Sequence, residues 1–151
     1  MQKYVEHSLE GTQDRRRLSV SNLLKVESLT GESTQVMRLF EQWRNKSDLR
    51  SYAWIDVSPD NPFNFVLHNH PGNFVGDLSN SVLNAYPYRM HARSCAAEYL
   101  ECKTEAQPVA HYVNQELSGN HREYVRLMIP IVDADGRVSK IVYAFRHIKP
   151  L

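Results

Sequence analysis

Cysteine is scarce in this chain, and its placement argues against cross-links and zinc. The 151 residues contain 2 cysteines, Cys95 and Cys102, and no Cys-x-x-Cys pair. If both lie on one helix, their spacing of seven residues separates their backbones by about 10 Å, which is too far for a disulfide. We therefore expect two reduced thiols and no structural zinc site.

Long hydrophobic runs and charge of one sign are also missing. No apolar stretch is long enough to cross a bilayer, and residues 1–10 lack the hydrophobic centre of a signal peptide. The formal net charge is +1, and the only basic run, at 15–17, lies in a polar stretch. This balance gives no field that would hold the chain on nucleic acid or on an anionic membrane. We therefore expect a soluble, cytoplasmic protein that binds neither.

Recognisable catalytic spacings are absent as well. The sequence shows no convincing Ser/His/Asp set, metal-binding cluster or phosphate-cradling loop. We therefore expect a protein that is not an enzyme, and we assign no catalytic and no metal-binding residue. Hydrophobic residues make up 42% of the chain and charged residues 23%. Because these fractions are ordinary for globular proteins, the composition predicts one folded domain with a real core.

The chain divides near residue 30. Residues 1–30 are polar and weakly patterned, which predicts a flexible arm or a flanking helix, whereas 31–151 predict the folded domain. An amphipathic helix is expected at 32–48, because apolar residues recur there at i, i+3, i+4 and i+7. The members of this stripe are Val36, Leu39, Phe40 and Trp43. The helix could cover the sheet of its own domain or pair with a second copy.

Two strands and a long helix follow. Apolar and aromatic segments at 51–57 and 63–70 flank a Ser-Pro-Asp-Asn-Pro turn and predict a β-hairpin. A short helical piece is expected at 77–84 and a long helix at 88–104. The expected inward stripe of the long helix comprises Tyr88, His91, Ala92, Cys95, Tyr99 and Cys102, with Arg93, Glu98 and Glu101 outside it.

The last third of the chain predicts strands only. They are expected at 109–116, 123–132 and 138–148, and the Asp-Ala-Asp-Gly sequence at 133–136 indicates a hairpin turn. The fold class is therefore α+β, with an antiparallel five-stranded sheet and helices on one face.

This order of elements resembles the PAS domain, in which two strands, a helical connector with one long helix, and three strands follow one another. The segment Tyr-Val-Arg-Leu-Met-Ile-Pro-Ile-Val-Asp-Ala-Asp-Gly-Arg-Val at 124–138 resembles stand-alone PAS-like proteins of proteobacteria in particular. The likeness spans 33–148. It implies a PAS-like sheet with an N-terminal flanking helix.

The resemblance also implies a function. PAS domains are sensory, signal-transducing modules that bind a small ligand between sheet and helices, and many form homodimers through the N-terminal helix. No kinase motif, Walker loop or DNA-binding helix pair is recognisable in the sequence. We therefore expect output through a homodimer or a separate signalling partner. The ligand-binding residues that we expect are Phe65, Tyr88, His91, Cys95, Tyr124 and Met128.

The cofactor stays open, with haem through His91 as one possibility. The resemblance places an axial histidine on the long helix after a Pro-x-Arg stretch, here Pro87-Tyr88-Arg89, although His91 stands about one residue from that position. A flavin is disfavoured, because Cys95 lacks the Asn-Cys-Arg-Phe-Leu-Gln surroundings of flavin photosensors. His68 and His70 share a strand face and could hold a metal only with a third donor such as His111.

Two other functions remain in competition with the sensor. One is a small cone-shaped α+β enzyme of the isomerase or dehydratase type, which would need an acid–base pair such as His91 with Glu98. Its class places the long helices before most of the strands, unlike the order expected here. The other is a PAS-like interaction domain whose pocket is filled by its own side chains. The sequence does not separate this last alternative from the sensor.

Overall fold

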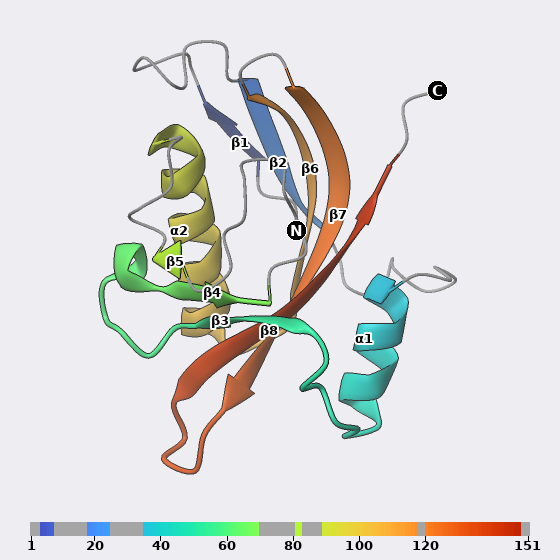
Figure 1. Ribbon diagram of the computed structural model, residues 1–151, viewed down its shortest axis with the longest axis vertical. Coiled ribbons are helices and arrows are strands. Elements are labelled where there is room, and N and C mark those ends of the chain that lie inside the picture. Colours follow the sequence, from blue (N-terminus) through green and yellow to red (C-terminus); the bar gives the residue numbers. More distant parts are fainter. Residues whose placement is uncertain are drawn as a thin grey trace.

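The computed structural model describes part of the chain, shown in Figure 1. The described residues are 4–7, 18–24, 35–69, 81–82, 89–117 and 120–148. The helices are α1 (Gln35–Arg44) and α2 (Arg89–Glu105), with a short 3₁₀ helix η2 (Pro62–Asn64). The strands are β1 (Tyr4–His7), β2 (Leu18–Leu24), β3 (Ala53–Asp56), β4 (Val66–His68), β5 (Ser81–Val82), β6 (Val109–Leu117), β7 (Asn120–Val132) and β8 (Val138–His147).

All of the described strands form one antiparallel sheet in the order β1-β2-β6-β7-β8-β3-β4-β5. The five strands expected from the sequence are the contiguous run β6-β7-β8-β3-β4. The early hairpin pairs β3 with β4, and β3 joins β8 at the end of the late meander. The α+β class and the five-stranded antiparallel core are therefore confirmed, and the arrangement is consistent with a PAS-like fold.

Three strands extend this core beyond the prediction. Residues 4–7 and 18–24, expected in a flexible arm or a flanking helix, form β1 and β2, and β2 pairs along β6. This pairing covers the backbone donors and acceptors on the outer side of β6. At the other end, residues 81–82 form β5 and not the expected helical piece. The rest of 77–84 lies outside the described residues.

The start of the second predicted strand is also different. Residues 62–64 form η2, and the strand begins only at Val66. Proline stands at the start of this helical turn, where no amide hydrogen is needed, and the side chain of Asn61 accepts a hydrogen bond from the Phe63 amide at 3.0 Å. The local capping residues therefore outweigh the alternating pattern that predicted a strand.

The two long helices lie on opposite faces of the sheet (Figure 1). Met128 of β7 belongs to the core under α2, whereas its neighbours Leu127 and Ile129 belong to the core under α1. Successive side chains of a strand point to opposite faces, so β7 is buried from both sides. The sequence predicted helices on one face of the sheet. α2 covers one face as expected, but α1 covers the opposite face.

Both helices bury the stripes that predicted them. In α1, Val36 and Leu39 are buried and Phe40 and Trp43 pack against the same cluster, so this apolar side covers the sheet of its own domain. In α2, the stripe from His91 to Cys102 is buried. Within the described part of the chain, no helix has both the length and the apolar character to cross a membrane.

Candidate functional site

A buried polar network fills part of the space between α2 and the sheet. Its members come from α2 and from the facing side of β6 and β7, where His111 and Arg126 stand directly opposite each other. They are His91, Cys95, Glu98, His111, Gln115, Tyr124 and Arg126, none more than 7% exposed. Buried polar and charged groups are costly unless they are paired, so a network of this size needs an explanation.

The centre of the network is an ion pair between Arg126 and Glu98. Arg126 Nη2 donates to Glu98 Oε1 at 2.6 Å. Burial by itself would lower the pKa of Arg126, but the Glu98 carboxylate together with the neighbouring Tyr124, Tyr99 and Cys95 side chains raises that pKa above its ordinary value. The guanidinium also lies 5.6 Å from the centre of the Tyr99 ring, in cation–π range. Arg126 therefore carries its charge inside the fold.

His111 is held in a defined tautomer by Arg126. Arg126 Nη2 lies 3.2 Å from His111 Nδ1, and because a guanidinium can only donate, Nδ1 accepts and Nε2 carries the hydrogen. Nε2 faces Glu101 Oε1 at 3.5 Å and Glu98 Oε2 at 3.8 Å. Burial lowers the pKa of His111 to about 4, with Glu98 acting in the opposite direction. The imidazole is therefore neutral at neutral pH.

A second branch joins His91 to β6 and β7. Gln115 Nε2 lies 3.2 Å from His91 Nδ1, and Tyr124 Oη donates to Gln115 Oε1 at 3.5 Å. An amide nitrogen only donates, so His91 Nδ1 accepts and Nε2 carries the hydrogen, 3.6 Å from Cys95 Sγ. Neither ring nitrogen presents a free lone pair to a metal. His91 as arranged therefore does not fit an axial haem ligand.

Two buried donors of the network have no hydrogen-bond partner among the described residues. They are His111 Nε2 and Arg126 Nε. The 3.5 Å approach of Nε2 to Glu101 is longer than the usual range for an N–H···O bond. Leaving a buried donor unpaired costs about 1–3 kcal/mol. Both donors therefore call for an acceptor atom from a water molecule or a ligand.

The structure brings together most of the residues predicted to bind a ligand. His91, Cys95 and Tyr124 belong to the second branch of the network. Phe65 and Met128 are fully buried in the adjoining core cluster on the same face. Tyr88 lies outside the described residues. Whether these residues contact a ligand stays a prediction.

The sequence interpretation missed the charged centre of the network. It placed Glu98 outside the inward stripe of the helix, but Glu98 is only 4% exposed and faces the sheet. The available signal was spacing, because Glu98 follows His91 by seven residues and therefore lies on the same helix face. Arg126 offered a second signal, since it is the one charged residue in the otherwise apolar and aromatic run at 124–132 of β7.

Two members of the possible histidine metal site, His68 and His111, lie on opposite faces of the sheet. His68 stacks on Trp54 at 4.0 Å between ring centres, on the α1 face, whereas His111 lies under α2. His70 lies outside the described residues. Within the described part of the chain, no group of three or more His, Cys, Asp or Glu side chains is placed to hold a metal ion.

Both cysteines are free and buried, as expected. Burial raises the pKa of Cys102 to about 12. Its Sγ faces the carbonyl oxygen of Gln107 at 3.7 Å, so Cys102 is a protonated packing residue and not a reactive thiolate.

Comparison with known proteins adds no assignment, because no protein-family model, no curated protein and no solved structure gives a significant match to the chain. Its class is therefore defined by its own geometry: an α+β domain with a PAS-like strand order and a buried polar network beneath α2.

Proposed function

We propose that this chain is a PAS-type sensory module that binds a small molecule between α2 and the sheet. The observation that carries the proposal is the pair of unpartnered donors, His111 Nε2 and Arg126 Nε, inside one buried network among the described residues. A domain that only packed against itself would gain more stability from apolar residues at these positions. A ligand with a suitable acceptor would instead complete the network.

The charges of the network select a class of ligand. Glu98 already neutralises Arg126, and Glu101 adds a further negative charge beside a neutral His111. The site therefore has no excess positive charge to attract an anion. A neutral molecule with a carbonyl or amide oxygen fits these donors better than a carboxylate does.

The proposal includes a cytoplasmic location and output through a homodimer or a separate partner. Because Val36 and Leu39 of α1 are buried against the sheet, they are not available to a second copy. A dimer formed through α1 would have to use the exposed side of the helix, which carries Arg38, Glu41 and Arg44.

A second candidate function is acid–base catalysis in a cone-shaped α+β enzyme. The observation in its favour is that His111 lies within 4 Å of both Glu98 and Glu101. Two features weigh against it. A histidine with a pKa of about 4 is a weak base at neutral pH, and its other nitrogen is already bonded to Arg126. We therefore favour binding over catalysis.

The test uses methionine methyl groups as reporters. The chain has 4 methionines, of which Met128 lies in the core under α2 and Met37 is on α1. We expect a neutral amide or carbonyl compound, found by native mass spectrometry of the purified protein or by screening, to shift the ¹³C-methyl signal of Met128 and not that of Met37. His111→Phe removes one unpartnered donor and should weaken binding about tenfold.

The matched control is His121→Phe, since His121 is exposed on the same sheet. This variant should bind the compound as the parent chain does. If no compound of this class shifts Met128, or if His111→Phe binds as tightly as the parent, the proposed site is wrong.

A further inference from the structure

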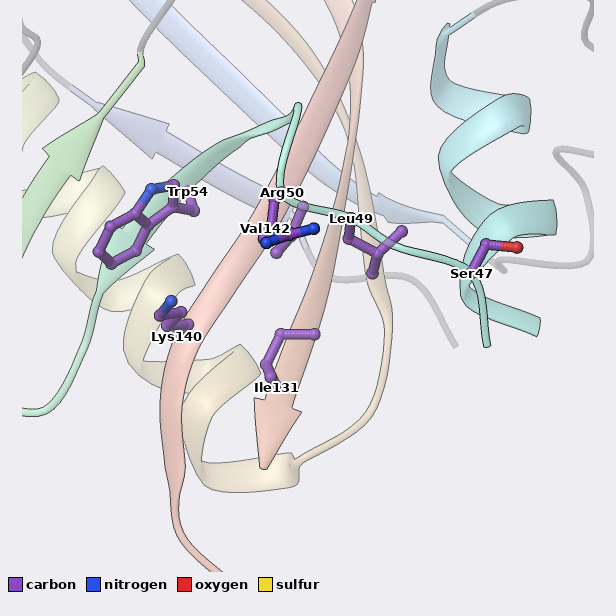
Figure 2. Close-up of a pocket in the computed structure, with 7 residues that line it drawn as sticks. All are labelled: Ser47, Leu49, Arg50, Trp54, Ile131, Lys140 and Val142. Carbon is purple, nitrogen blue, oxygen red and sulfur yellow. The ribbon is translucent and has the colours of Figure 1, made fainter. Parts of the chain in front are cut away.

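A separate pocket lies on the opposite face of the sheet, beside the end of α1. Its volume is about 380 Å³, within the usual range for small-molecule sites. Figure 2 shows Trp54 and Lys140 on one side and Leu49 and Ile131 on the other. The complete lining is Ser47, Leu49, Arg50, Trp54, Ile131, Lys140 and Val142. None of these residues belongs to the network under α2, so this pocket is independent of the proposed function.

The walls of the pocket combine an aliphatic floor with two cations. Leu49, Ile131 and Val142 provide branched aliphatic side chains, and no acidic residue is among the lining residues. Arg50 uses its Nε and Nη2 atoms to bind the Asp48 carboxylate, at 2.7–3.0 Å, so Asp48 offsets much of its charge. Lys140 is exposed and lines the pocket, with its ammonium over the Trp54 ring. The charge available to a ligand is therefore mainly that of Lys140.

The contacts of the Trp54 ring favour an aliphatic over an aromatic ligand in this pocket. One contact of its ring is the stacked His68 ring, 4.0 Å away between centres. Another is the Lys140 ammonium, 4.4 Å from the ring centre. Because both groups sit over the indole, its face is not open to stacking by an aromatic ligand. An aliphatic chain lying on Leu49, Ile131 and Val142 needs no such face.

Two acidic residues of this region, Asp56 and Asp48, are engaged by other partners. Asp56 stands opposite Lys140 in the β3–β8 pair, but its carboxylate is turned to the amide and hydroxyl of Ser58, at 3.0 and 2.7 Å, and forms no ion pair with Lys140 among the described residues. Asp48 is bound to Arg50. Lys140 is thus the cation best placed to pair with an incoming anion.

We propose that this pocket binds a free aliphatic carboxylate, with the chain on the Leu49/Ile131/Val142 floor and the carboxylate at Lys140. The test is a titration with octanoate, followed through the indole N–H signals of the 2 tryptophans in ¹H–¹⁵N spectra. Trp43→Phe assigns the two signals. Saturable binding should shift the Trp54 signal and leave the Met128 methyl unchanged.

Matched ligands and variants separate charge from hydrophobic contact. Octan-1-ol should bind more weakly than octanoate, and octylamine should not bind. Lys140→Gln should weaken octanoate binding about 2–5-fold, as expected for an exposed charge pair, and Lys140→Glu should abolish it. Arg137→Gln, an exposed cation in the β7–β8 turn, is the control and should leave binding unchanged.

Three results would overturn the proposal. They are a Trp54 signal that does not move with octanoate, octylamine binding as tight as octanoate binding, and unchanged affinity in Lys140→Glu. One form of the first result is a shift of Met128 without a shift of Trp54. It would show that octanoate binds in the network under α2 and not in this pocket.

Discussion

At the scale of single residues, Arg126 is the point where the buried polar contacts converge. It pairs with Glu98, donates to His111 and lies against Tyr99. Arg126→Met should destabilise the fold by about 3–5 kcal/mol, because the Glu98 carboxylate would remain buried without its partner. Urea unfolding measures this change.

The double variant Glu98→Gln/Arg126→Met tests the cause of that loss. It removes both charges and should recover much of the stability, since residues in direct contact are coupled. Arg50→Met breaks the fully exposed Asp48–Arg50 pair and should have no measurable effect. Equal losses in the single and double variants would show that packing, and not the unpaired charge, is responsible.

His111 predicts how stability depends on pH. Its pKa is about 4 in the folded chain, mainly because of burial, against about 6.5 in an unfolded chain. Between these values the unfolded chain binds more protons, so stability should fall as pH falls from 6.5 to 4, by about 3 kcal/mol. Urea unfolding at a series of pH values gives the curve.

The control for this curve is a second histidine. Burial also lowers the pKa of His147, which is more exposed, so it contributes in the same direction. His111→Gln keeps an acceptor for Arg126 and should flatten most of the slope, whereas His147→Gln should flatten little of it. If the stability of His111→Gln depends on pH as steeply as that of the parent chain, a group other than His111 causes the effect.

Individual residues were predicted unevenly, for a physical reason. His91 and Cys95 were placed correctly because apolar periodicity marks the buried face of a helix, and both fall on that face. Glu98 occupies the same face but was read as a solvent-facing charge. Its burial depends on Arg126, 28 positions away. No local pattern carries such a partnership.

At the scale of elements, the β7–β8 hairpin depends on its turn. Gly136 has φ +81°, and a Cβ atom there would meet nothing within 4 Å. Gly136→Ala should therefore cost about 1 kcal/mol, from backbone strain alone. Gly136→Asn should cost less, because asparagine tolerates this conformation better. Thermal unfolding of the three chains measures the order, and an alanine variant as stable as the parent would contradict it.

The elements that the sequence predicted best are those with a strong periodicity or turn. The long helix and the three late strands agree with the structure to within a few residues. The sequence did not predict β1 and β2, because their weakly patterned segments are stabilised by pairing: β2 pairs with β6, and β1 pairs with β2. The prediction for 63–70 failed at its start, where Asn61 and Pro62 favour a helical turn. Long-range pairing and local capping are both poorly visible in apolar periodicity.

At the scale of the whole molecule, the two cores are joined through shared strands. Met128 contributes to the core under α2, while Leu127 and Ile129 contribute to the core under α1, all from β7. If one core unfolds, β7 loses its packing on that face, and the core on the other face of the same strand is weakened as well. The prediction of helices on one face missed this coupling, although the nearly continuous apolar run of β7 is typical of a strand buried from both sides.

This sharing predicts a single cooperative unfolding transition. Trp54 stacks on His68 on the α1 face and Met128 lies under α2, so tryptophan fluorescence and the Met128 methyl signal report opposite faces. Leu39→Ala should remove about 2–5 kcal/mol from the α1 core and shift both probes equally in urea. A fluorescence transition that moves while the Met128 transition stays in place would mean that the two cores unfold independently.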